Sequence, residues 1–148
     1  MPETEYGGPF LQIAALCERV LHEQDGVLSL IRVVDRYTIP EPQKGKPPVA
    51  IQPTAVILFK AGFATGKYYV KLKIHTPSGK VLPEQEFPVL FEGNDRGAGI
   101  VAVMNLALEE EGLYWIDVNL QDAVAPITRI PLRILHLKVP RHSETEQG

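Results

Sequence analysis

Few residues of this sequence have the types and spacing that a reaction centre requires, and the nearest approach is a glycine-rich loop. Residues 62–67, Gly-Phe-Ala-Thr-Gly-Lys, invite comparison with a phosphate-binding loop. The comparison fails because only three residues separate the glycines and Tyr68 stands where Mg²⁺ needs a Ser or Thr. A strand pattern also follows, in place of the helix whose amino terminus holds phosphate. We therefore expect no nucleotide site here.

Metal-binding and nucleophilic residue types are equally dispersed. The four histidines show no i,i+2 or i,i+4 pairing and no nearby cysteine; they are His22, His75, His136 and His142. The single cysteine, Cys17, stands in an apolar run, where a thiol packs as a small hydrophobe. No serine lies in a G-x-S-x-G motif, and the acidic run 109–111 is expected to form a solvated turn. The sequence predicts no catalytic residue, no metal ligand and no cofactor.

Two aromatic side chains, Tyr69 and Trp115, are better candidates for a binding site than the loop, histidine, cysteine and serine residues above. The segments 66–74 and 112–120 share the pattern Gly-x-Tyr-aromatic followed by alternating apolar and polar residues. In a strand this alternation turns Tyr69 and Trp115 outward on the same phase. Outward rings on neighbouring strands can bind a sugar ring, a nucleobase or an apolar side chain of a partner. The alternative is that both rings only cover their own sheet.

The same pattern assigns a structural role to Tyr114. The glycine before it lets the chain turn sharply into the strand, and the tyrosine ring then points into the core. Its hydroxyl can reach the backbone of the preceding corner, as in the tyrosine corner of sandwich folds. Tyr68 holds the equivalent position in the other segment.

The elements that must position these residues are strands. Thirteen prolines and twelve glycines divide the chain into short apolar segments, which is typical of strands joined by turns. Residues 67–76, 113–121 and 129–136 alternate with a period of two. Pro131 cannot donate to a ladder, so the last strand should be an edge, or carry Pro131 at a bulge or on its unpaired side. We expect an antiparallel β-sandwich of about seven to nine strands.

The opening segment, residues 10–23, fits both a helical stripe and a strand face, and periodicity does not decide between them. The hairpin signal Asp25-Gly26, followed by the β-branched run 31–39, favours a strand. Residues 40–48 contain four prolines and should form an exposed connector.

Residues 99–108 are apolar on both strand faces, and the first hairpin shares this property. A two-layer domain of this size covers only one face of such a strand, so we expect a contact with a partner or a second copy there. The outward residues of this segment are Val101 and Val103.

Composition and charge limit the partners and the cell compartment that we expect for this protein. The 148 residues carry a net charge of −3, which disfavours nucleic acid and anionic lipid as partners. No apolar run approaches the roughly 20 residues of a membrane-spanning helix. The acidic, Gly/Pro-rich start is unlike a secretory signal, so we expect a cytoplasmic protein. We expect one domain over residues 10–138, a flexible segment 1–9 and a disordered tail 139–148.

The hairpin over 16–35 and the Gly-x-Tyr strand near the carboxyl end resemble a family of small, uncharacterised bacterial immunoglobulin-like β-sandwich proteins. The resemblance spans residues 10–138 and implies an immunoglobulin-like fold without an assigned activity. We expect a non-catalytic protein-interaction or assembly module that binds a protein partner or itself. A small-ligand or carbohydrate-binding β-sandwich is the alternative, and an enzyme whose site forms only in three dimensions is less favoured.

Overall fold

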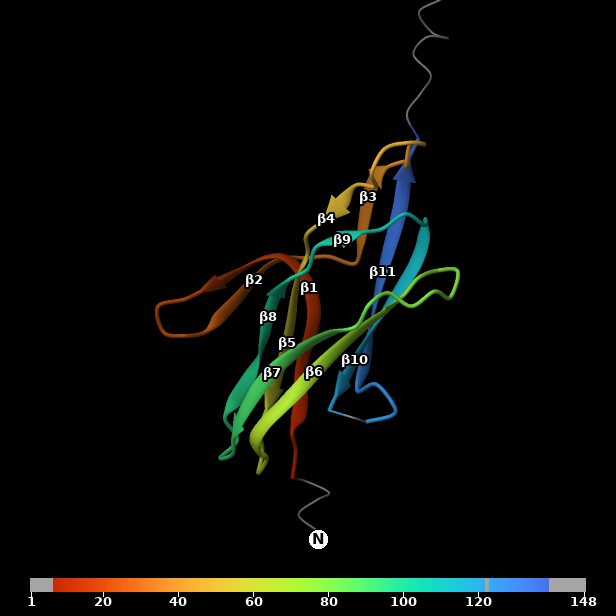
Figure 1. Ribbon diagram of the computed structural model, residues 1–148. Helices are drawn as coiled ribbons and strands as arrows, with labels where there is room; N and C mark the ends of the chain where they lie inside the picture. The colour runs from red at the N-terminus through yellow and green to blue at the C-terminus, as the bar shows by residue number, and fades with distance from the viewer. Residues whose placement is uncertain (1–6, 122, 139–148) are drawn as a thin grey trace, which may run out of the picture.

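The computed structural model describes residues 7–121 and 123–138, and every regular element in this part of the chain is a β-strand (Figure 1). The predicted tail 139–148 and most of the predicted flexible start lie outside the described residues. Gly7, which belongs to that start, accepts a hydrogen bond from the Phe63 N–H at 2.8 Å. No helix long and apolar enough to cross a membrane occurs among the described residues.

The strands form two large sheets and one small one. The four-stranded sheet has the order β2-β1-β5-β8, made of β1 Phe10–His22, β2 Leu28–Val33, β5 Thr54–Lys60 and β8 Gly97–Val103. The five-stranded sheet has the order β3-β11-β10-β6-β7, made of β3 Arg36–Pro40, β11 Thr128–Leu137, β10 Gly112–Leu120, β6 Thr65–His75 and β7 Gln85–Glu92. The two-residue strands β4 Ala50–Ile51 and β9 Leu106–Ala107 pair with each other.

The prediction of an all-β chain is confirmed. The prediction of an antiparallel fold of about seven to nine strands is corrected, because the described residues form eleven strands and β3 pairs parallel with β11. The run 31–39 is not one strand, because the chain changes sheets between two adjacent residues. The Val34 N–H bonds to Leu16 O of the four-stranded sheet at 2.8 Å, whereas Asp35 O accepts from Arg133 N in the other sheet at 2.9 Å. The chain then continues as β3, which pairs parallel with β11.

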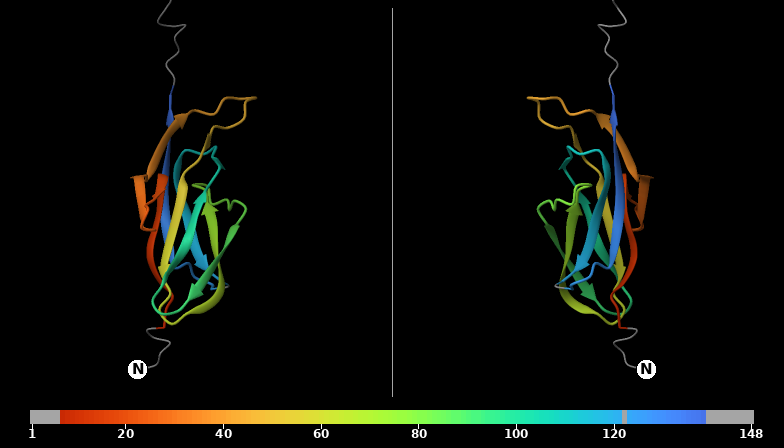
Figure 2. Two further views of the ribbon diagram at one scale, coloured as in Figure 1. Left: turned by 90° about the vertical axis from the view of Figure 1, so that its left-hand side faces the viewer. Right: turned by 90° about the vertical axis from the view of Figure 1, so that its right-hand side faces the viewer.

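The open choice at residues 10–23 is resolved in favour of a strand. β1 is 13 residues long and is shared by β2 and β5. Its register with β5 shifts between Leu11 and Ile13, which bends the strand. Gly26, with φ 86°, closes the predicted hairpin, and residues 41–49 form the predicted exposed connector, which projects beside the end of β11 (Figure 2).

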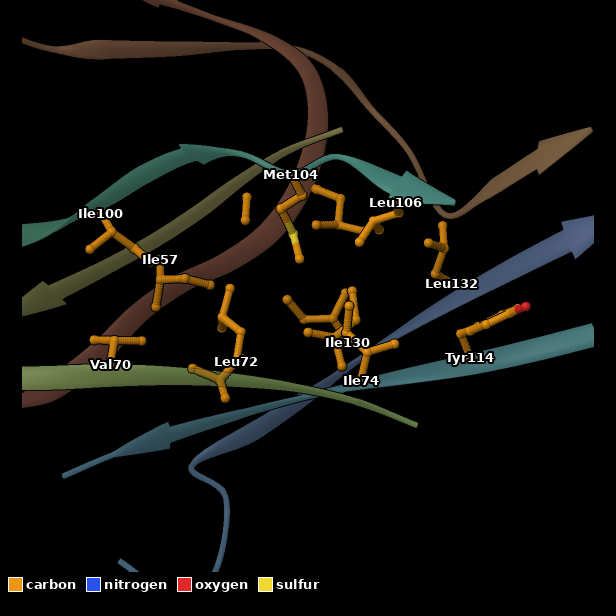
Figure 3. Packing of buried hydrophobic residues seen from close by; sticks show 14 of the residues in the cluster. Ile57, Val70, Leu72, Ile74, Ile100, Met104, Leu106, Tyr114, Ile130 and Leu132 are labelled. Carbon is orange, nitrogen blue, oxygen red and sulfur yellow. The ribbon is translucent and has the colours of Figure 1, made fainter. Parts of the chain in front are cut away.

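One hydrophobic core takes side chains from both large sheets (Figure 3). The prediction that alternate residues of β6 and β10 share it is confirmed: the buried members are Val70, Leu72, Ile74, Tyr114, Ile116 and Val118, with Tyr68 and Leu120 half-buried against them. Pro131 pairs with Trp115 of β10 on one side of its strand. On the other side β3 begins to pair with β11 only at Arg133, so this side is unpaired at Pro131. Of the options predicted for Pro131, the unpaired side is confirmed and the edge strand is wrong.

The predicted tyrosine corner is present. Tyr114 is 1% exposed, and its hydroxyl donates to Glu110 O at 2.8 Å and accepts from Glu110 N at 3.0 Å. The glycines that precede the two similar strands, Gly66 and Gly112, both have positive φ, at 107° and 132°. Only glycine adopts these angles without strain, which explains why each strand is entered through one.

The acidic run 109–111 is more than a solvated turn. Glu110 accepts hydrogen bonds from Ser78 N at 3.0 Å and from Ser78 Oγ at 2.9 Å. The Glu111 carboxylate accepts from His136 N at 2.7 Å. These carboxylates therefore connect the β9–β10 loop to the β6–β7 loop and to β11.

Candidate functional site

Several exposed apolar residues lie on the outer face of the four-stranded sheet. Strand register places Val33, Cys17, Thr54 and Val103 in one row across all four strands. Val33 and Val103, at the ends of the row, are 66% and 71% exposed. Cys17 and Thr54, in its middle, are buried. The next row contains Ala15, Val56 and Val101, in which Val101 is 39% exposed and Val56 is buried.

A groove of about 350 Å³ runs between this face and the tip of the β1–β2 hairpin. The hairpin residues Gly26 and Leu28 form one wall, and Leu58, Gly99 and Val101 belong to the opposite side. Figure 1 shows the hairpin leaving the body of the molecule on the side where β8 lies. The groove therefore joins the first hairpin to β8, and its walls are mainly apolar side chains and glycine backbone.

Gly99 explains how Leu58 reaches the groove. The two residues are register partners on β8 and β5. A Cβ at Gly99 would lie 2.8 Å from Leu58 Cδ2 and 2.2 Å from the carbonyl oxygen of Ile57. Because such contacts are too short, only glycine lets the Leu58 side chain lie across β8. A larger residue would push β8 away from β5.

The predicted interface residues thus lie together. Val101 and Val103 face outward, while Ile100, Met104 and Leu106 of the same segment are buried in the core. The sequence predicted apolar surface separately at this segment and at the first hairpin, and the structure places both at one groove. The sequence did not show that the middle of the face, at Cys17 and Val56, is covered.

Burial makes the Cys17 thiol unreactive. Its thiol is free and buried, and it donates a weak hydrogen bond to Arg19 O at 3.5 Å. Desolvation raises the pKa of the thiol above its ordinary value, although the Arg19 carbonyl bond opposes this. A buried thiol of raised pKa is a poor nucleophile.

Tyr69 and Trp115 both face outward from the five-stranded sheet, as predicted, but they do not form a joint platform. Trp115 lies opposite His75, whereas the Tyr69 backbone exchanges hydrogen bonds with Gln121 at 2.7 and 2.8 Å. Six residues along β10 separate these two pairings, which is about 20 Å at the rise of a strand. The physical reason is that β6 and β10 run antiparallel, so equivalent positions of the two similar segments lie at opposite ends.

Trp115 instead borders a cavity that also contains His75, Asp117 and Arg129. Sequence reasoning missed Asp117 and Arg129. Asp117 stands on the outward phase of β10, where a carboxylate is expected in solvent, yet it is 7% exposed. Its burial depends on side chains from both neighbouring strands, and alternation within one strand carries no sign of them.

A family model of proteins of unknown function, DUF6941, matches residues 12–135. The chain belongs to this family. The DUF6941 match begins within β1 and ends within β11, so it includes Val101, Val103, Trp115 and Asp117. Comparison of this DUF6941 protein with curated proteins and with solved structures gives no match.

Proposed function

We propose that this DUF6941 protein is a non-catalytic interaction module, an immunoglobulin-like sandwich that docks a protein partner on the outer face of its four-stranded sheet. The observation that carries the proposal is the groove between the β1–β2 hairpin and β8, which Val101 lines, with the exposed Val103 two residues farther along β8. Large apolar side chains that cluster around a concavity mark contact sites for proteins. We place the module in the cytoplasm, a location that suits its free cysteine.

The charges on the hairpin favour a protein over a nucleic acid. Glu18 and Arg32 pair with each other, with Oε1 and Nε 2.9 Å apart. A paired charge contributes little net field, and nucleic acids need a surplus of cations. An apolar centre with charged residues near its border is the usual composition of a protein interface.

The groove also limits the shape of the partner segment. Its volume of about 350 Å³ is enough for one or two apolar side chains, not for a whole structural element. We propose that a partner inserts such side chains between Leu28 and Val101 and covers Val103 with the adjoining surface. A buried apolar anchor surrounded by weaker contacts is the usual distribution of binding energy.

Affinity capture from the source organism, with mass spectrometric quantification, tests the proposal. Wild-type bait is compared with Val103→Glu, which places a charge on the face, and with Val124→Glu, which changes a fully exposed valine of the β10–β11 loop. We expect a partner that wild type and Val124→Glu retain and Val103→Glu loses. Light scattering of the three proteins tests the same face for self-association.

The unfolding midpoint of each bait shows whether the charge has only unfolded the protein. Val103 is 71% exposed, so the Val103→Glu protein should remain folded. If folded Val103→Glu binds every wild-type partner and has the same mass in solution, the proposal is wrong.

A further inference from the structure

A second cavity, of about 300 Å³, opens on the outer face of the five-stranded sheet where β6 ends. The strand residues that line it are His75 of β6, Trp115 and Asp117 of β10, and Arg129 of β11. The turn after β6 contributes Thr76, Pro77 and Gly79. This volume is at the lower end of the range, about 300–1,000 Å³, that small-ligand pockets occupy.

A buried carboxylate organises the polar side of this cavity. The Asp117 side chain is 10% exposed, and its Oδ2 lies 3.0 Å from His75 Nε2. Arg129 Nε lies 3.1 Å from Oδ1, but its N–H is not aimed at this oxygen, which therefore has an ion-pair contact and no hydrogen bond. Asp117 thus holds two basic side chains at the cavity and keeps unused accepting capacity on Oδ1.

Trp115 supplies the apolar side. Its side chain faces outward between the register partners His75 and Pro131, and the residue is 41% exposed. An indole ring in a polar depression offers a flat apolar surface beside hydrogen-bonding groups. The arrangement combines one flat aromatic face with a carboxylate, an imidazole and a guanidinium.

This combination selects among ligand classes. A cation bound at Trp115 would meet Arg129, and an anion would meet Asp117, so neither sign of net charge is favoured. A molecule with several hydroxyl groups can accept hydrogen bonds from Arg129 and donate one to Asp117. The Arg129 side chain is 60% exposed, so it can move to let a hydroxyl group reach Oδ1.

We propose that this cavity binds a neutral sugar ring, with the apolar face of the pyranose on the Trp115 indole and its hydroxyl groups on Asp117 and Arg129. This site lies on the other sheet from the groove described under Proposed function. The two assignments can therefore fail independently.

The experiment uses the fact that Trp115 is the only tryptophan of the chain. Fluorescence excited at the long-wavelength edge, where indole absorbs and the five tyrosines do not, therefore reports on this cavity alone. The full chain is titrated with the neutral oligosaccharides maltohexaose, cellohexaose, chitohexaose and laminarihexaose, and with oligogalacturonate as the acidic comparison. Each is added up to about 10 mM, and a dissociation constant above this value is counted as no binding. We expect a saturable change of emission with at least one neutral oligosaccharide.

Variants then connect the signal to the proposed contacts. Asp117→Asn and Arg129→Gln should each weaken binding at least about tenfold, the size of one charge-assisted hydrogen bond. Tyr69→Ala, which changes the outward ring at the other end of β6, should leave it unchanged. The inference is overturned if no neutral oligosaccharide changes the emission, if only oligogalacturonate does, or if folded Asp117→Asn and Arg129→Gln bind as wild type does.

Discussion

Val33 and Val103 lie at opposite ends of one cross-strand row of the four-stranded sheet, three strand spacings or about 14 Å apart. Both are mostly exposed, while Cys17 and Thr54 between them are buried. The outer face therefore has a covered middle and two exposed apolar ends. The β8 end, at Val103, continues the strand from Val101, which lines the groove at which we place the partner.

Cys17 should behave as a packing residue. Because burial raises the pKa of its thiol, native protein should react with Ellman's reagent far more slowly than protein in denaturant. The measurement is the rate of thiolate release with and without urea. A fast reaction of the native protein would contradict the covered middle of the outer face.

The Tyr114 corner should be a major source of stability. Tyr114→Ala should lower the free energy of unfolding by about 3–5 kcal/mol through loss of a buried aromatic ring. Tyr114→Phe should cost about 1–3 kcal/mol, because Glu110 N–H and C=O lose their hydroxyl partner. Urea unfolding measures both, and Tyr68→Phe, at the half-buried equivalent position of β6, is the matched control. Equal costs for the two Phe variants would refute the corner.

Stability should depend on pH through Glu110. The Ser78 hydroxyl bond is the largest of the causes that lower the pKa of this carboxyl. A carboxyl with a depressed folded-state pKa stabilises the protein above its unfolded-state pKa, and this contribution is lost as pH falls through the folded-state value. Wild type should therefore exceed Glu110→Gln in stability at neutral pH, and the difference should disappear in acid.

Chemical unfolding of the two proteins over a pH series measures this difference. Glu109→Gln removes a charge from the same loop and leaves the Ser78 bonds in place, so it serves as the control. A Glu110→Gln difference that is constant with pH would show that the Ser78 bonds do not depend on the charge.

Trp115 should contribute little to stability. Because the residue is 41% exposed, Trp115→Ala should lower the free energy of unfolding by clearly less than the roughly 3–5 kcal/mol of a fully buried aromatic ring. The thermal transition of the variant measures this. A large loss would mean that the indole packs as part of the sheet, and the sugar-binding role of its free face would then have no support.

Local pattern predicted the strands well, and it predicted their partners poorly. Alternation after Gly66 and Gly112 identified β6 and β10 and the inward Tyr114, because a period of two is a property of each strand alone. The change of sheet between Val34 and Asp35 was not predictable, since β-branched residues occur on both sides of it within the run 31–39. Its position is set by hydrogen bonds to Leu16 and Arg133, which are distant in the sequence.

At the candidate sites, too, local pattern predicted which way a side chain faces and did not predict its neighbours from other strands. The outward phase of Val103 and Trp115 followed from alternation, whereas the separation of Tyr69 from Trp115 follows from the antiparallel register of β6 and β10. Asp117 was missed because its burial depends on His75 and Arg129, which flank it from two other strands.

The most direct test of the proposed docking face is site-specific photo-crosslinking. A photoreactive benzoylphenylalanine is placed at position 103 in one strain of the source organism and at position 124 in another, and both are irradiated in living cells. The account predicts a discrete crosslinked product, containing a partner protein or a second copy of the chain, from position 103 and not from position 124. If position 103 gives no product, or both positions give the same products, the outer face of the four-stranded sheet is not a docking site.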